Sequence, residues 1–211
     1  MNLAYDLDGV IADFNTPYSA LMQRQSGIQF PPVTDTWPSV WGYDRATLEA
    51  DGVSRADATA IINEVWTEIK NSSFWGTLPL LGHGAETLRQ ARQLRAAGHN
   101  IYFITSRPGR FAKLLSEDWL MRHDVPAPAV FIATNAEDKA RIGGFLSLDV
   151  FIDDKPENCV TMLGVAHYVY LQDASWNKGW KQPGVQRTAR PALAVNEVLK
   201  LEGMSVLKKV A

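Results

Sequence analysis

Five short, mostly apolar runs constrain the fold of this chain more than any other feature. They cover residues 2–5, 100–105, 129–134, 149–153 and 167–171, and helical patterns fall between them. Strands that are buried on both faces of a parallel sheet have such continuous runs, whereas half-solvated strands alternate apolar and polar residues. Because strands that alternate with helices form an open α/β sheet, we expect a parallel sheet with helices on both faces.

Helices are expected at 84–98, 109–125, 156–165 and near 194–201. The first ends at Gly98, which is a natural C-cap, and the second stops before Pro126. Pro156 lies near the first turn of the third helix, where proline is tolerated. The C-terminal segment from Gln172 is expected to begin as a loop, at residues 173–184.

The stretch between the first two runs breaks this alternation. Residues 57–70 predict a helix and residues 30–43 are rich in proline and tryptophan, but nothing in the stretch is typical of a parallel strand. We therefore expect a core made of residues 1–13 and 79–211. A small, mostly helical cap at 14–78 would be inserted into it after the first strand.

Composition narrows the class of protein. The chain has 211 residues, a formal net charge of -2 and a single cysteine, Cys159. Acidic and basic residues are mixed throughout, which argues against a partner that is a nucleic-acid polymer. No apolar run reaches the length of a membrane span, and no basic region precedes an apolar run at the start. We expect a cytoplasmic protein with a buried cysteine, and the sequence leaves a homodimer open.

Asp6 and Asp8 directly follow the first run, and Gly9 comes next. Residues two apart on a strand point to the same side, so the two carboxylates converge where the strand ends. Gly9 allows a sharp turn at that point. Two carboxylates this close repel each other unless a cation lies between them, and oxygen ligands favour Mg2+. A carboxylate held in this way can attack phosphorus, and its neighbour can move the protons.

Other polar residues follow later strands and meet the acid pair, because parallel strands end at one edge of the sheet. The inventory is Thr105, Ser106 and Arg107 after the second run, Lys139 in the expected loop after the third, and Asp153 and Asp154 at the fourth. A hydroxyl and a lysine suit a phosphoryl group, and the late acids suit a metal. Lys155 competes with Lys139, and Arg107 either binds phosphate or pairs with a surface acid.

The segments "DLDGVIAD", "ITSR", Lys139 and "FIDDKPE" resemble the four motifs of the haloacid dehalogenase (HAD) superfamily of phosphotransferases. The resemblance covers residues 2 to about 171 and implies a Rossmann-like fold with a cap. It implies Asp6 as the nucleophile, Asp8 as the general acid and base, Thr105, Ser106, Arg107 and Lys139 at the phosphate, and Asp6, Asp8, Asp153 and Asp154 at a Mg2+ ion. Which of Asp153 and Asp154 contacts the ion directly stays open.

Within that superfamily the chain looks most like the 5'(3')-deoxyribonucleotidases. "ADFN" after the first motif, "FWGTLPLLGHGAETL" on the return from the cap and "YLQDASWNKGW" after the sheet carry this likeness. It implies an enzyme that hydrolyses nucleoside monophosphates, with Phe14 and Trp75 as contacts of the base. Aromatic residues are numerous in the cap, and packing is the competing explanation for most of them, including Trp66. The role of Trp176 is open.

Two other functions remain. A sugar phosphate or another small phosphoester would need the same catalytic residues, and the sequence hardly distinguishes these substrates. A receiver-like or non-catalytic phosphate-binding module also combines acids, a hydroxyl and a lysine on a parallel sheet. The adjacent acid pair of receivers ends the first strand, whereas Asp153 and Asp154 come late in this chain, which argues against that reading. His83, between two glycines, is expected to lie in a turn before a helix.

Overall fold

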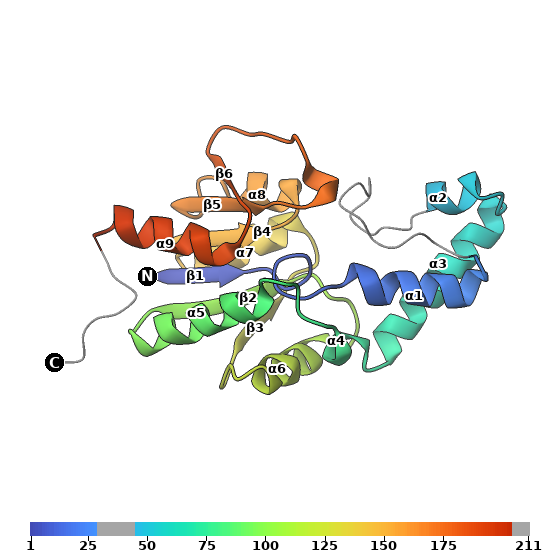
Figure 1. Cartoon of the computed structure of the whole chain (residues 1–211), viewed down its shortest axis with the longest axis horizontal. Helices are drawn as coiled ribbons and strands as arrows, with labels where there is room; N and C mark the ends of the chain where they lie inside the picture. The colour runs from blue at the N-terminus through green and yellow to red at the C-terminus, as the bar shows by residue number, and fades with distance from the viewer. Residues whose placement is uncertain (29–44, 204–211) are drawn as a thin grey trace.

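The computed structural model describes residues 1–28 and 45–203, and one parallel sheet organises them. The sheet has six strands in the order β3-β2-β1-β4-β5-β6 (Figure 1). The strands are β1 (Asn2–Tyr5), β2 (Asn100–Thr105), β3 (Ala129–Ile132), β4 (Val150–Asp153), β5 (Tyr168–Gln172) and β6 (Val185–Thr188). The chain builds outward from β1 on one side and then from β4 on the other. A ligand crevice is expected between the carboxyl ends of those two strands.

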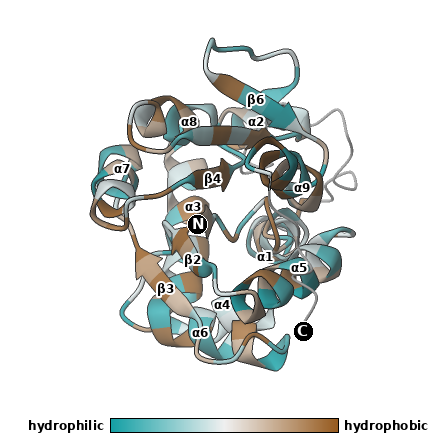
Figure 2. Ribbon diagram, turned by 90° about the vertical axis from the view of Figure 1, so that its left-hand side faces the viewer, coloured by the Kyte–Doolittle hydropathy of each residue, from teal (hydrophilic) through white to brown (hydrophobic). Residues whose placement is uncertain are grey.

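Helices cover both faces of the sheet, as Figure 2 shows along the strands. On one face lie α5 (Gly84–Ala96), α6 (Ala112–Arg122) and α9 (Pro191–Leu201), and on the other lie α7 (Ala136–Phe145) and α8 (Pro156–Met162). A short 3-10 helix, η1 (Ser175–Asn177), lies between β5 and β6. The expected fold class is therefore confirmed.

The alternation of side chains explains why the strands are apolar throughout. Leu3 and Tyr5 of β1 pack in the core on the α5, α6 and α9 side, whereas Ala4 between them packs with α7 and α8. In β4, Ile152 and Phe151 divide in the same way. Each side chain of these central strands is thus removed from water, and this burial of apolar area stabilises the sheet.

One expectation about local structure is wrong, and one strand was not anticipated. Val185–Thr188 forms β6, directly after the loop expected at residues 173–184. It has no apolar run because it is an edge strand with two exposed residues, Gln186 and Arg187. Lys139 lies in the first half of helix α7 and not in a loop. Asn135 caps that helix by accepting a hydrogen bond from the Asp138 amide, which is a common start signal.

The cap follows β1 and consists of α1 (Asn15–Ser26), α2 (Arg45–Ala50), α3 (Arg55–Asn71) and α4 (Phe74–Thr77). Figure 1 shows α1 to α3 beyond the carboxyl ends of the strands. The two crossings between core and cap lie side by side, because Ala12 and Leu80 form an antiparallel bridge. The boundaries at residues 14 and 78 stay predictions, and Trp37, Trp41 and Tyr43 lie outside the described residues. None of the described helices is long and apolar enough to cross a membrane.

Candidate active site

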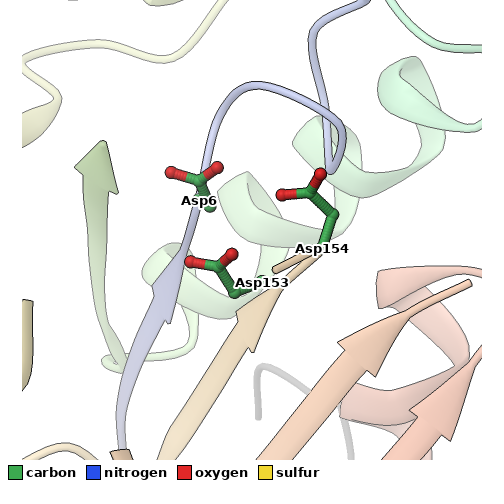
Figure 3. Close-up of side chains that lie close together, drawn as sticks. All are labelled: Asp6, Asp153 and Asp154. Atoms are coloured by element: carbon green, nitrogen blue, oxygen red, sulfur yellow. The ribbon is translucent and has the colours of Figure 1, made fainter. Parts of the chain in front are cut away.

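Three buried carboxylates gather at the carboxyl edge of the sheet. Asp6 follows β1, and Asp153 and Asp154 lie at the end of β4, the adjacent strand (Figure 3). One oxygen of each carboxylate lies within 4.8 Å of the others. The parallel register brings them together, since Tyr5 pairs with Ile152 and the Asp6 amide donates to the Ile152 carbonyl. The sequence expectation that these acids converge matches this geometry.

Lys139 crosses from α7 to this cluster. Its ammonium group donates to Asp6 Oδ1 at 2.8 Å and to Asp153 Oδ2 at 2.7 Å, and the lysine is 1% exposed. Burial lowers the pKa of Lys139, but the carboxylates of Asp153 and Asp6 outweigh it and raise that pKa overall. The lysine therefore stays charged. It bonds only one oxygen of Asp6, and no described residue donates to Oδ2.

Asp153 has its hydrogen-bonding capacity filled by protein groups. Besides Lys139, it accepts bonds from the Asn158 side-chain amide at 3.0 Å on both oxygens and from the Lys155 backbone amide at 2.9 Å on Oδ1. Sequence reasoning missed Asn158. Its signal was one polar side chain in the short helix expected at residues 156–165, and a buried side-chain amide needs a hydrogen-bond partner.

Asp154 is the exception in the cluster. Its Oδ1 is buried and has no hydrogen-bond partner among the described residues, although buried carboxylates are normally paired. The three acids and one lysine would leave two negative charges uncompensated if all the acids were ionised. An all-oxygen donor set with this charge fits a hard divalent cation such as Mg2+.

Burial shifts the acids toward their neutral forms when no cation is bound. Burial outweighs the opposing effect of Lys139 and, together with the charges of Asp153 and Asp8, raises the pKa of Asp6 to about 7. It also raises the pKa of Asp154 well above its usual value, with the charges of Asp153 and Asp6 adding to the rise. A cation would have to displace protons from these groups.

Gly9 is required where Asp8 turns into the following loop. Its φ is +79°, a conformation that favours glycine, and a Cβ at this position would lie 2.4 Å from Asp154 Oδ2. The loop closes on itself, because the Ile11 and Ala12 amides both donate to the Leu7 carbonyl. The glycine after the second aspartate thus admits the Asp154 carboxylate.

Gly9→Ala is therefore expected to lower the free energy of unfolding by about 1–3 kcal/mol through backbone strain. It should also weaken Mg2+ binding by roughly tenfold or more, because Asp154 must move. Gly98→Ala is the matched control, since Gly98 has a φ of +88° and nothing lies within 4 Å of a Cβ there. Urea unfolding and calorimetric Mg2+ titration measure the two effects. Backbone strain should lower the stability of both variants, so a loss of Mg2+ affinity in Gly98→Ala equal to that in Gly9→Ala would contradict the steric explanation.

Thr105 ends β2, and Ser106 and Arg107 follow it, on the side of β1 opposite to β4. Thr105 is buried and its hydroxyl lies 3.5 Å from Asp8 Oδ2, while Ser106 is exposed and lines the same pocket as Asp6 and Lys139. Arg107 was expected either to bind phosphate or to pair with a surface acid. Its guanidinium is buried and bonds the carboxylate of Asp8, so the pair belongs to the site and not to the surface. In this geometry the guanidinium bonds Asp8, and Arg107 also lines the pocket that Asp6 and Lys139 line.

Aromatic rings line the cap side of the pocket. Phe14, Trp66 and Trp75 all line it, and Phe14 stacks on Trp75 at 5.8 Å and on Trp66 at 6.0 Å between ring centroids. Phe14 and Trp75 are also almost fully buried, so packing accounts for much of their contact. Trp66, expected in the core, reaches the pocket as well. Trp176 also lines the pocket, and its indole N–H has no partner among the described residues.

His83, Cys159 and Asn177 support the structure around the pocket. His83 precedes α5 and its Nε2 lies 3.0 Å from the Val10 carbonyl oxygen, and burial lowers the pKa of the imidazole. It therefore braces the loop that carries Asp8. Cys159 is fully buried in the core beneath β4, as expected. Asn177 was missed, and its side-chain amide donates to the Asp154 carbonyl at 2.8 Å.

The fold of the chain matches that of solved proteins. A haloacid dehalogenase-like family hydrolase from Streptococcus pneumoniae aligns with a TM-score of 0.61 over 93% of this chain and 97% of its own, at 12% identity. The chain has the HAD fold. The sequence motifs that resemble the HAD motifs therefore lie on the fold that the resemblance implies. No protein-family model matches the sequence.

Two curated proteins share part of the sequence. One from Bacillus cereus, described as "Putative nucleotidase", is 26% identical over 125 residues, or 58% of this chain and 64% of that protein. Another, from Oceanobacillus iheyensis with the same description, is 28% identical over 123 residues, or 56% of this chain and 62% of that protein. The match thus spans less than two thirds of either relative.

Proposed function

We propose that this HAD-fold chain is a Mg2+-dependent phosphomonoesterase that hydrolyses nucleoside monophosphates through an aspartyl-phosphate on Asp6. The observation that carries the proposal is the acid cluster of Asp6, Asp153 and Asp154 with Lys139, at the crevice between β1 and β4. Aromatic rings that line the same pocket and the descriptions of the two relatives support a nucleotide as the substrate.

Asp6 is the nucleophile in this proposal. Lys139 fixes its Oδ1, so Oδ2 is the oxygen that attacks phosphorus. Asp8 gives its proton to the departing ester oxygen as the bond from phosphorus to that oxygen breaks. In the second step Asp8 accepts a proton from water, whose oxygen attacks phosphorus and releases inorganic phosphate from Asp6. Thr105 and Ser106 donate hydrogen bonds to phosphate oxygens, and Lys139 neutralises their charge.

Asp6, the Asp8 backbone carbonyl and Asp154 are the proposed ligands of the Mg2+ ion. Within residues 1–28 and 45–203, Asp154 Oδ1 is buried and has no hydrogen-bond partner, whereas the oxygens of Asp153 already accept from Lys139, Asn158 and the Lys155 amide. We therefore assign direct contact to Asp154 and the positioning of Lys139 to Asp153. When bound, Mg2+ would offset the charge that gathers on the phosphoryl oxygens.

The affinity for Mg2+ is expected to rise between about pH 6 and about pH 8, by roughly tenfold per pH unit for each proton released. The sign follows from burial, which raises the pKa of Asp6 to about 7 and also raises that of Asp154, so binding at lower pH must displace protons. Calorimetric titration in two buffers of different ionisation enthalpy counts those protons. Affinity that is independent of pH would contradict the assignment of these ligands.

A phosphate-release assay tests the function. Ribo- and deoxyribonucleoside 5'- and 3'-monophosphates, sugar phosphates and p-nitrophenyl phosphate are compared with Mg2+ and with EDTA. Faster Mg2+-dependent release from nucleotides than from sugar phosphates is the expected result. A preference for sugar phosphates would support the proposed phosphatase chemistry but contradict nucleoside monophosphates as the substrate. No release from any ester would refute the enzymatic proposal.

A further inference from the structure

Arg107 is a buried cation whose partner is not one of the three clustered acids. Its side chain is 0% exposed, whereas that of Asp8, its partner, is 18% exposed and faces the pocket. It stands two residues after Thr105, where β2 ends. A fully buried guanidinium is costly unless its charge and its donors are satisfied. What it bonds is therefore informative about the site.

The guanidinium of Arg107 donates hydrogen bonds to both carboxylate oxygens of Asp8. Nε donates to Oδ2 at 2.9 Å, and Nη2 donates to Oδ1 at 2.8 Å. This is the two-pronged geometry in which arginine fixes the plane of a carboxylate as well as its position. Asp8 otherwise stands on a loop next to Gly9, so its carboxylate has few other restraints.

The guanidinium is itself fixed from behind. Its Nη1 donates to Ser116 Oγ of α6 at 2.9 Å and to the Trp75 carbonyl at 3.4 Å. The guanidinium carbon, Cζ, lies 5.1 Å from the ring centroid of Trp75 and 5.7 Å from that of Trp119. Lysine offers no planar fork and could not make this set of contacts. Arg107 thus connects Asp8 to α6 and to α4 of the cap.

We propose that Arg107 is the positioning residue of Asp8, which it holds at the ester oxygen and later at the attacking water. The inference rests on the proposed function. A general acid must lie within hydrogen-bond reach of the atom that it protonates, and displacement by about 1 Å costs about 100-fold in rate. The alternative is that the ion pair only stabilises the fold. The two differ in how the rate depends on the leaving group.

Arg107→Met tests this, because methionine keeps an extended side chain between the tryptophans but loses the fork. On a nucleoside 5'-monophosphate, kcat is expected to fall by about 100-fold or more, with KM within about threefold of wild type. p-Nitrophenolate leaves without a proton, so the first turnover of p-nitrophenyl phosphate should slow by less than about tenfold. Dephosphorylation would then limit the rate, giving a burst of nitrophenolate stoichiometric with enzyme.

Two further variants separate positioning from stability. In the Asp8→Asn background, Arg107→Met should cost less than about threefold, because residues that act as a unit are not additive. Val198→Ala, in the core contact of α9, is the control for lost stability and should leave the ratio of the two substrates unchanged. If Arg107→Met does not fold, Arg107→Lys carries the same comparison, with a smaller loss of the same pattern.

Equal losses on both substrates without a burst, or losses that add to those of Asp8→Asn, would overturn the positioning role. Unchanged or increased turnover by Arg107→Met would overturn it as well, since the pair would then restrain Asp8 without aiding it. If the wild-type protein releases no phosphate from either ester, the proposed function fails and the inference fails with it. An active wild-type protein separates that failure from failure of the inference alone.

Discussion

Asp6→Asn is expected to reduce phosphate release by about 10⁴-fold or more, the size of effect seen when a covalent nucleophile is removed. Asparagine keeps the shape of the side chain, but its amide does not attack phosphorus at a comparable rate. It also removes one negative charge from the cluster around Lys139, so the variant should fold. The measurement is Mg2+-dependent phosphate release from a nucleoside monophosphate.

Asp118→Asn is the control for the chemical change itself. Asp118 lies on α6, and its half-exposed side chain pairs with Arg122. Because exposed pairs contribute little, activity and stability should both stay close to wild type. Release by Asp6→Asn at a rate near that of the wild-type protein would exclude Asp6 as the nucleophile. A large loss in the Asp118 variant would show that the assay reports on stability.

Lys139→Met is expected to lower the free energy of unfolding in EDTA by about 3–5 kcal/mol, the usual cost of removing one partner from a buried ion pair. It leaves the buried carboxylates of Asp6 and Asp153 without a cation. Mg2+ should restore part of the loss. The loss should shrink as the pH falls, because a carboxyl whose folded pKa is raised destabilises the fold only when it must ionise.

Lys155→Met provides the comparison for Lys139. Lys155 also lines the pocket and stands beside Asp154, but it is only partly buried. Its loss should cost less than about 1 kcal/mol. Urea unfolding of both variants, with Mg2+ and with EDTA, gives the free energies. If the two variants lose equal stability, Lys139 does not carry the charge balance of the cluster.

The sequence predicted the features that depend on periodicity and on strand ends. Continuous apolar runs placed five of the six strands, because those strands are buried on both faces. The rule that parallel strands end at one edge then brought Asp6 together with Asp153 and Asp154. The edge strand Val185–Thr188 escaped because its outward residues are polar and its pairing with β5 is not a local property.

The sequence could not predict partners that depend on tertiary contacts. Arg107 was a candidate for phosphate or for a surface acid, and only the approach of α4 and α6 shows that its donors point to Asp8, Ser116 and the Trp75 carbonyl. Asn158 was hidden because one polar residue in a short helix is common. Whether rings such as Phe14 stack on a base or only on each other is likewise not encoded in their spacing.

The most direct test of the central claim is a search for the phosphorylated enzyme. The wild-type protein is mixed with a nucleoside monophosphate and Mg2+, quenched in acid within milliseconds, digested and analysed by mass spectrometry. The account predicts one phosphoryl group on the peptide that contains Asp6, absent in EDTA and absent in Asp6→Asn. Phosphate release with no phosphorylated peptide at any quench time, or with the group on another residue, would contradict it.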